Sequence, residues 1–502
     1  MAEVHIRPIS ETKGVPSGWL DHLLPYLLFA LPVILTSRLP FFWDTLQLGS
    51  RHAQYFYDHN FNSLFLPNDM DSGHIPALGM YLALVWKLFG KTLIVSHLSM
   101  LPFVLGAVYF TRQLVDRLFQ TRWSGLITCF LLADATILTQ FTLVSPDVWI
   151  VFFLMMALSA SFAKKRFLLA IAALGLALTS MRGMMITVAL FTADFLFVVF
   201  IREQPDDKKF WIKKAGGYIL RSLPVYLPAF LVSVTYMGLH FLRTGWIGYH
   251  SGMPWAEHFE RVDATGFLRN VLILGWRLAD QGRIFLWITG LVLLILSFRL
   301  KWKTDGNGRR LLIFLVVMML ILGYSALTYK NLAGHRYQIP VFLLLSLTVI
   351  YHLMKWVGQR KKVLLILVLL ILGMVSGNFW VYPDRISKGW DAMLAYLPYQ
   401  SLRHEMIGFI EQNHIEFSNV GTGFPNNTGM NVIELSGDTR AFGSMEAGMD
   451  NFRFIFYSNV YNEFSDDDLT ELRTEWKVVK SLHKGQVKMI LYENPYWVIP
   501  SR

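Results

Sequence analysis

Long apolar runs occupy most of this chain, and a water-soluble domain does not contain such a series. Each run has roughly 15–22 residues, near the number that a helix needs to cross a bilayer. Hydrophobic residues make up 54% of the 502 positions and charged residues only 16%, so the sequence predicts a polytopic α-helical membrane protein. The runs lie at Leu20–Ser37 and near residues 94–111, 124–142, 147–163, 167–181, 184–201, 217–238, 283–298, 311–328, 339–354 and 363–381.

Basic clusters follow alternate runs and set the expected orientation, because positive residues mark the cytoplasmic side. If Ile75–Phe89 also crossed the membrane, parity would place these clusters outside. We therefore expect Ile75–Phe89 to be a helix lying in the outer interface, with about eleven spans, the N-terminus inside and residues 38–92 as one large external loop. The net charge of +11 then reflects topology, and no nucleic-acid partner is expected. The clusters lie at residues 112–122, 164–166, 202–214, 299–310 and 355–362.

The composition changes after the last run, where apolar stretches shorten and charges become dense. We predict two domains, a transmembrane domain over residues 1–382 and an extracytoplasmic α/β domain over residues 383–502. The patterns in the second domain predict a helix over Ser401–Asn413, strands over Phe452–Tyr461 and Val487–Tyr492, and a helix that starts at Ser465.

Two further features bear on processing and cross-linking. The N-terminus is polar, and no small-residue cleavage site follows Leu20–Thr36, so a cleavable signal peptide is not expected. The single cysteine, Cys129, lies in an apolar run and cannot form an internal disulfide.

The first external loop carries the first candidate site. Asp44 follows Phe41, Phe42 and Trp43 at the predicted membrane face, where reduced dielectric suits a general base. The alternative is a solvated loop carboxylate.

An acidic group with a histidine, made of Asp69, Asp71 and His74, follows in the same loop. These side chains supply plausible ligands for a divalent metal or an edge that binds the acceptor. The spacing is unspecific, and a solvated acidic loop fits equally well.

Two later external turns bring more charges. Asp147 opens an apolar run after Pro146, either as a helix N-terminal charge or as a second acid of the same cavity. Arg182 lies in a turn on the side where positive residues are rare, so it needs a partner. That partner is a lipid phosphate, which arginine binds through two N–H groups, or it is Asp147.

A third external turn holds Lys330, His335 and Arg336. With Arg182 these cations are expected to form a phosphate or diphosphate pocket; the alternative is a basic loop that touches anionic lipid head groups. The aromatic-rich loop 239–281 either stacks on sugar rings or anchors the chain at the interface.

Five segments in order resemble one family. They read FFWDTLQLGSRHAQYF, DMDSGHIPALGMYLALVWKLFG, VSPDVWIVFFLMMALS, LALTSMRGMM and YKNLAGHRYQIPVFLLL, and together they cover about residues 20–355. The chain is similar to the membrane-integral C-type glycosyltransferases that use a polyprenyl-phosphate sugar, among them the protein O-mannosyltransferase-like group and the lipid A aminoarabinose transferases.

This resemblance implies roles for individual residues. Asp44 matches the catalytic acid of the first loop, Asp147 the acid that opens a later span, and Arg182 a position where relatives often carry lysine. The turn containing Arg336 and Tyr337 matches the basic loop on the donor side. Two departures concern the acceptor: Thr45 stands where many relatives have an acid, and His74 with Ile75 precedes Pro76 where many have Lys-Pro or Pro-Pro.

The function expected from this resemblance is inverting transfer of a hexosyl or pentosyl group to a lipid, glycan or protein acceptor on the external face. The expected partners are the polyprenyl-phosphate-linked donor, the acceptor and membrane lipids, and a divalent metal ion is left open as a cofactor. The expected location is a bacterial inner membrane. The alternative is a transporter or flippase, whose signature would be charges inside spans and inverted repeats; the charges here gather on one face.

Overall fold

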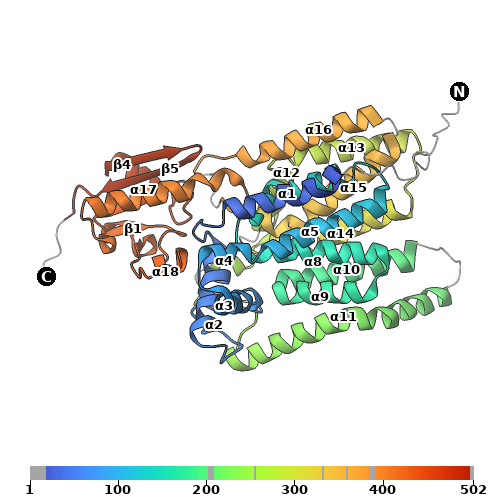
Figure 1. The fold of residues 1–502 in the computed structure, drawn as a ribbon, viewed down its shortest axis with the longest axis horizontal. Coiled ribbons are helices and arrows are strands. Elements are labelled where there is room, and N and C mark those ends of the chain that lie inside the picture. Colours follow the sequence, from blue (N-terminus) through green and yellow to red (C-terminus); the bar gives the residue numbers. More distant parts are fainter. Residues whose placement is uncertain are drawn as a thin grey trace.

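The computed structural model describes residues 19–201, 208–253, 256–330, 333–357, 360–384, 386 and 390–497. The polar N-terminal tail and residues 202–207 of one basic cluster lie outside this part of the chain. Apolar helices form a bundle, and a small sheet domain lies at one end of it (Figure 1). The helices before this domain are α1 (Trp19–Leu35), α2 (His52–Asp58), α3 (Ala77–Phe89), α4 (Leu93–Leu98), α5 (Leu101–Phe119), α6 (Ser124–Leu132), α7 (Ala135–Phe141), α8 (Pro146–Ala163), α9 (Arg166–Thr179), α10 (Met181–Leu196), α11 (Lys208–Thr244), α12 (Ala264–Ala279), α13 (Ile284–Arg299), α14 (Gly306–Thr328), α15 (Ile339–Val357) and α16 (Arg360–Ser376).

The membrane prediction agrees with these helices, while the count of spans is only partly supported. Within the described residues, seven helices are long and apolar enough to cross a membrane, or nine if each bent pair counts as one span. These nine correspond to predicted runs. The other two predicted spans are α1 and α9, with 17 and 14 residues. At 1.5 Å per residue, α9 is about 21 Å long, which is short of the roughly 30 Å hydrocarbon core. The total of eleven therefore stays a prediction.

Two pairs of consecutive apolar helices are sharply bent relative to each other, which the hydropathy pattern did not predict. The axes of α6 and α7 differ by 83°, and those of α12 and α13 by 92°. Asp134 occupies the first break, where its carboxylate caps α7 by accepting the N–H groups of Thr136 and Ile137. The same carboxylate accepts two hydrogen bonds, of 2.6 and 2.7 Å, from Arg283 at the second break. Both side chains are buried, so this ion pair fixes the two breaks to each other.

The tail domain is a five-stranded sheet with helices. The strand order is β2-β1-β3-β5-β4; β1 pairs in parallel with β2 and β3, and β5 pairs antiparallel with β3 and β4. The predicted helix over Ser401–Asn413 and both predicted strands are present, and Ser465 caps the predicted later helix. The tail elements are α17 (Pro398–Gln412), β1 (Val420–Thr422), α18 (Met430–Ile433), β2 (Gly443–Ser444), β3 (Phe454–Ser458), α19 (Asp466–Thr474), β4 (Lys477–Lys484) and β5 (Val487–Glu493).

The first loop contributes to the core of this tail domain. Phe42 is fully buried, with its ring 4.6 Å from that of Tyr396 and 5.2 Å from that of Tyr399. Trp43 packs on Phe424 at 5.3 Å. The tail domain thus buries Phe42 and Trp43, while the position of Asp44 at the membrane face stays a prediction. Figure 1 shows α2, α3 and α4 at the same end of the bundle as the tail.

Candidate active site

The starts of three bundle helices meet at the end that faces the tail domain. The Ser145 hydroxyl caps α8 by accepting the N–H of Asp147 at 3.1 Å, and Ser180 caps α10 in the same way. Arg336 lies in a short helical turn directly before α15. Helix starts present free N–H groups and a partial positive charge, so this place favours anions.

Asp147, at the start of α8, contacts an arginine at each of the other two helix starts. Its carboxylate is fully buried, with Oδ1 2.7 Å from Nη1 of Arg182 and Oδ2 3.7 Å from Nη1 of Arg336. Arg182 also donates a 2.8 Å hydrogen bond to the main-chain oxygen of Arg336. Gly183 allows this placement, because a Cβ there would collide with the main chain of Leu176 in α9. The expected alternative, pairing of Arg182 with Asp147, is what the structure shows.

Arg336 is the centre of the cluster. Its Nη2 ion-pairs with Asp44 of the first loop, and its Nε lies 2.9 Å from Oδ2 of Asp391. The guanidinium carbons of Arg182 and Arg336 each lie 4.9 Å from the centre of the Tyr337 ring. Four predicted residues that lie far apart in the sequence are thus brought together.

Exposure separates the acids of this cluster. The Asp44 side chain is 34% exposed, Asp391 is 14% exposed and Asp147 is fully buried. Asp44 is therefore the carboxylate that a substrate can reach most directly.

His74 lies beside this cluster as a neutral imidazole. Burial lowers its pKa to about 4, and the nearby charge of Arg182 acts in the same direction. Its Nδ1 is buried and has no hydrogen-bond partner within the described residues. It is an uncommitted polar atom next to charged groups, as a substrate-binding residue would be.

The structure does not bring Lys330 and His335 into the cluster. Lys330 is exposed and lies 3.2 Å from a carboxylate oxygen of Glu260. His335 is buried, and its Nε2 lies 2.8 Å from Oδ2 of Asp280. The phosphate pocket expected from four cations is thus reduced to Arg182 and Arg336.

The three metal candidates do not converge either. Asp71 is buried; its Oδ2 lies 3.0 Å from Nε2 of His240, and its Oδ1 accepts the N–H of Gly73. Asp69 is exposed. Among the described residues, no group of three or more His, Cys, Asp or Glu side chains is arranged to hold a metal ion. Trp246, from the aromatic loop, packs its ring 4.4 Å from that of His240 and supports this pair.

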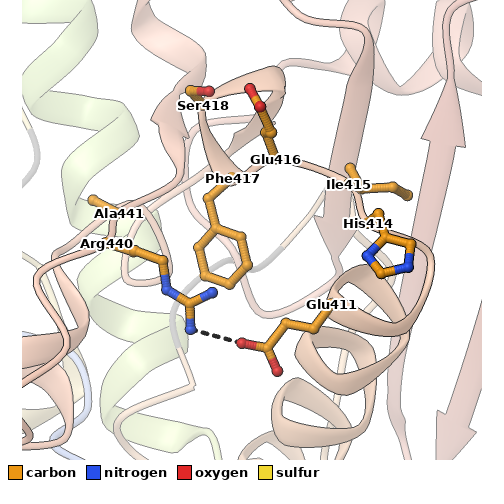
Figure 2. Close-up of a pocket in the computed structure, with 8 residues that line it drawn as sticks. All are labelled: Glu411, His414, Ile415, Glu416, Phe417, Ser418, Arg440 and Ala441. Atoms are coloured by element: carbon orange, nitrogen blue, oxygen red, sulfur yellow. Dashed lines mark hydrogen bonds and ion pairs between the residues drawn. The ribbon is translucent and has the colours of Figure 1, made fainter.

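A separate hollow lies on the tail domain, as Figure 2 shows. Phe417 forms its floor, and Arg440 lies over that ring at 4.3 Å while pairing with Glu411 at 2.6 Å. This hollow lies at the C-terminal end of α17, while the residue of α17 that contacts Phe42 is near the start of the helix. The 15 residues of α17 make the helix about 22 Å long. Its only cation is committed to neighbouring acids, so it is a weaker candidate than the cluster around Arg336.

Comparison with solved structures identifies the fold. Crystal structures of ArnT from Cupriavidus metallidurans, bound to undecaprenyl phosphate and in the apo state, match 95% of this chain and 98% of their own. The TM-score is 0.50 and the sequence identity 11%. The chain has the ArnT fold. This confirms the fold that the resemblance to membrane-integral C-type glycosyltransferases implies.

Other comparisons add little to the ArnT fold. The arabinofuranosyltransferase AftD from mycobacteria matches 94% of this chain and 40% of its own, with a TM-score of 0.44 and 12% identity. No protein-family model and no curated protein sequence matches the chain.

Asp391 is the member of the cluster that sequence reasoning missed. It follows the last apolar run in a segment without a motif, and its partner Arg336 lies 55 residues earlier in the chain. One signal was available: Asp391 stands between Trp390 and Ala392, in a short apolar stretch that ought to be buried. A charge inside such a stretch needs a partner.

Proposed function

We propose that this protein transfers a sugar from a polyprenyl-phosphate donor to a hydroxyl or amine acceptor on the extracytoplasmic face of a bacterial inner membrane. The observation that carries the proposal is the Arg336 cluster, where two arginines meet three helix starts beside a partly exposed carboxylate. The ArnT fold supports it, because one ArnT structure contains undecaprenyl phosphate.

The proposed reaction is a direct displacement with inversion. Asp44 accepts the proton of the acceptor group, whose lone pair forms the new bond to the anomeric carbon. The bond from that carbon to the phosphate oxygen breaks, and polyprenyl phosphate leaves with the bonding electrons. Arg336 and Arg182 stabilise the developing phosphate charge, an effect that is typically worth about 3–4 kcal/mol per well-placed donor.

His74 completes the proposed site. Its imidazole is neutral at neutral pH, so its uncommitted Nδ1 is suited to a hydrogen bond with the acceptor or the sugar rather than to pairing with phosphate. Asp147 touches both arginines and serves as a positioning residue.

The transporter alternative has less support. A transporter places its charged site between broken helices near the bilayer midplane. Here Asp147, Arg182 and Arg336 are at helix starts, and the broken pairs α6–α7 and α12–α13 are held by a buried internal ion pair between Asp134 and Arg283.

The test is an assay of the purified protein with polyprenyl-phosphate sugars, following release of polyprenyl phosphate. Asp44→Asn keeps the shape of the side chain but cannot accept the proton, so turnover is expected to fall at least roughly 100-fold while donor affinity persists. Asp58→Asn, an exposed carboxylate in α2, is the matched control and should keep full turnover. Near-normal turnover of Asp44→Asn would remove Asp44 from the chemistry.

A further inference from the structure

All three nitrogens of the Arg336 guanidinium face carboxylates. Nη2 pairs with Asp44, Nε lies 2.9 Å from Asp391, and Nη1 lies 3.7 Å from Asp147. The Arg336 side chain is only 9% exposed. A phosphate that binds Arg336 must therefore take the place of one of these carboxylates.

Asp391 is the carboxylate that a phosphate can replace without removing the proposed base. Asp44 also has a single ion pair in the described part of the chain, with Arg336, but its carboxylate must stay in the site to accept the acceptor's proton. Asp147 is fully buried and has a second ion pair with Arg182. Asp391 has one ion pair among the described residues, with Arg336. Its main-chain oxygen accepts a 2.6 Å hydrogen bond from Gln140, which anchors the backbone and leaves the side chain able to turn.

The charges around Asp391 oppose a further anion. Among the five ionised side chains of the cluster, three carboxylates face two guanidinium groups, so one negative charge is in excess before a phosphate arrives. The elements packed around Asp391 add two other groups, Arg277 on α12 and the Tyr337 hydroxyl. Arg277 has no ion pair within the described part of the chain and compensates this excess only from a distance.

We propose that Asp391 occupies Arg336 in the free protein and takes up a proton when the donor phosphate replaces it there. This inference rests on the proposed function, since it assumes that the phosphate binds Arg336. It makes Asp391, carried by the segment that joins the last span to the tail domain, a positioning residue for the donor. The proton comes from solvent, and no covalent bond other than that O–H bond changes.

The direction of the pH effect follows from this exchange. Burial raises the pKa of Asp391 to about 6, which the Arg336 charge opposes and the Asp44 and Asp147 charges reinforce. A bound phosphate anion raises that pKa further. The donor complex then holds more protons than the free protein above about pH 6, so donor affinity rises as the pH falls. Below about pH 6 Asp391 is already protonated, and the affinity levels off.

The test measures binding of undecaprenyl methyl phosphate, a phosphodiester that has no phosphate proton to titrate near neutral pH. For the full-length protein, the dissociation constant should increase as the pH rises from about 6 to about 8, by at most about tenfold per pH unit, because a single proton is linked. Titration calorimetry in two buffers of different ionisation enthalpy should show net proton uptake on binding. Asp391→Asn cannot ionise, so its affinity should be independent of pH and at least as high as that of the unchanged protein near pH 6.

Two controls separate this effect from other titrations. Glu463, in the tail domain, has its pKa raised by burial to about 7, and its neighbours Glu446 and Asn427 are not part of the cluster. Glu463→Gln should therefore keep the pH dependence. His74, with a pKa of about 4, does not change its charge in this range.

Each outcome has one meaning. A pH-independent affinity of the unchanged protein with no proton uptake overturns the role of Asp391 and leaves the proposed function standing. A pH dependence that persists in Asp391→Asn overturns it as well. Absence of binding at every pH removes the phosphate site itself and, with it, the proposed function. If Asp391→Asn does not fold, the absence of proton uptake by the unchanged protein still overturns the role of Asp391.

Discussion

At the scale of single residues, the cluster depends on the shape of arginine. One planar guanidinium meets Asp44 with Nη2 and Asp391 with Nε, while its third nitrogen faces Asp147. An ammonium group is a point charge and cannot present separate N–H groups in these fixed directions. Removing the charge of Arg336 altogether would leave three carboxylates near one another. Replacement by lysine keeps the charge and therefore tests the shape of the guanidinium alone.

Arg336→Lys is expected to weaken binding of the donor phosphate about 10- to 100-fold, because one charge-assisted hydrogen bond is lost, which is worth about 1.5–3 kcal/mol. Arg182→Ala should also weaken binding. The double variant should lose less than the sum of the two free-energy changes, since both side chains contact Asp147. The dissociation constant of undecaprenyl phosphate measures this.

The matched control is Arg440→Lys, a surface arginine of the tail domain, which should bind as the unchanged protein does. Unaltered donor affinity in both single variants would mean that the two arginines do not share a phosphate.

At the scale of secondary-structure elements, a buried pair ties the first loop to α11. Asp71 and His240 are 1% and 2% exposed, and their side chains lie 3.0 Å apart. The N–H of Gly73 also donates to Asp71, in a turn whose positive φ of 70° suits glycine. The pair fixes the stretch that leads to His74, so it holds the proposed substrate-facing residue in place.

Asp71→Ala is expected to destabilise the protein by about 1–3 kcal/mol, because it leaves Nε2 of the buried His240 imidazole without its partner. The first loop should become the earliest site of limited proteolysis, and the thermal midpoint should fall. Asp69→Ala changes an exposed carboxylate two residues away and should leave both measurements unchanged. Equal effects of the two substitutions would show that the loop is not held by Asp71.

The sequence predicts elements better than it predicts their partners. Apolar runs locate the helices because hydropathy is a local property, and Asp44, Asp147, Arg182 and Arg336 stand out because charges next to such runs are rare. The pairing of Asp71 with His240 joins positions 169 residues apart, which no spacing rule encodes. The same holds for Asp391, whose role appears only when the tail domain packs on the first loop.

At the scale of the whole molecule, the tail domain and the first loop form one packed unit next to the site. Ser50 and Gln54 donate hydrogen bonds of 2.7 and 2.9 Å to main-chain oxygens near α18, and the N–H of Phe41 donates to Ile433 at 2.8 Å. Asp384, after the last bundle helix, pairs with Lys488 at 2.6 Å and Arg473 at 2.8 Å. These contacts set the position of the segment that carries Asp391.

Phe42→Ala should therefore affect both stability and turnover. The side chain is fully buried between tail-domain aromatics, so its loss is expected to cost about 3–5 kcal/mol. Turnover should fall as well, because Asp44 and the tail segment both lose their common support. Phe298→Ala, an aromatic that is 76% exposed on α13, is the control and should leave the thermal midpoint within a degree or two. Normal stability of Phe42→Ala would show that packing of the first loop against the tail domain does not stabilise the protein.

The last prediction concerns how the molecule crosses the membrane. The nitrogen of Lys87, near the end of α3, donates a 2.7 Å hydrogen bond to Asn60, which follows α2. Because the end of α3 contacts the segment that follows α2 in the same loop, α3 is expected to lie on one face of the bilayer rather than cross it. In a Cys129→Ser background, single cysteines at Asp69, Lys87 and Lys330 should react with an impermeant thiol reagent from the outer side. Cysteines at Lys165 and Lys301, which are also exposed, should react only from the inner side. Labelling of Asp69 and Lys87 from opposite sides would make α3 a span and reverse every later assignment, so this one pair decides the orientation of the site.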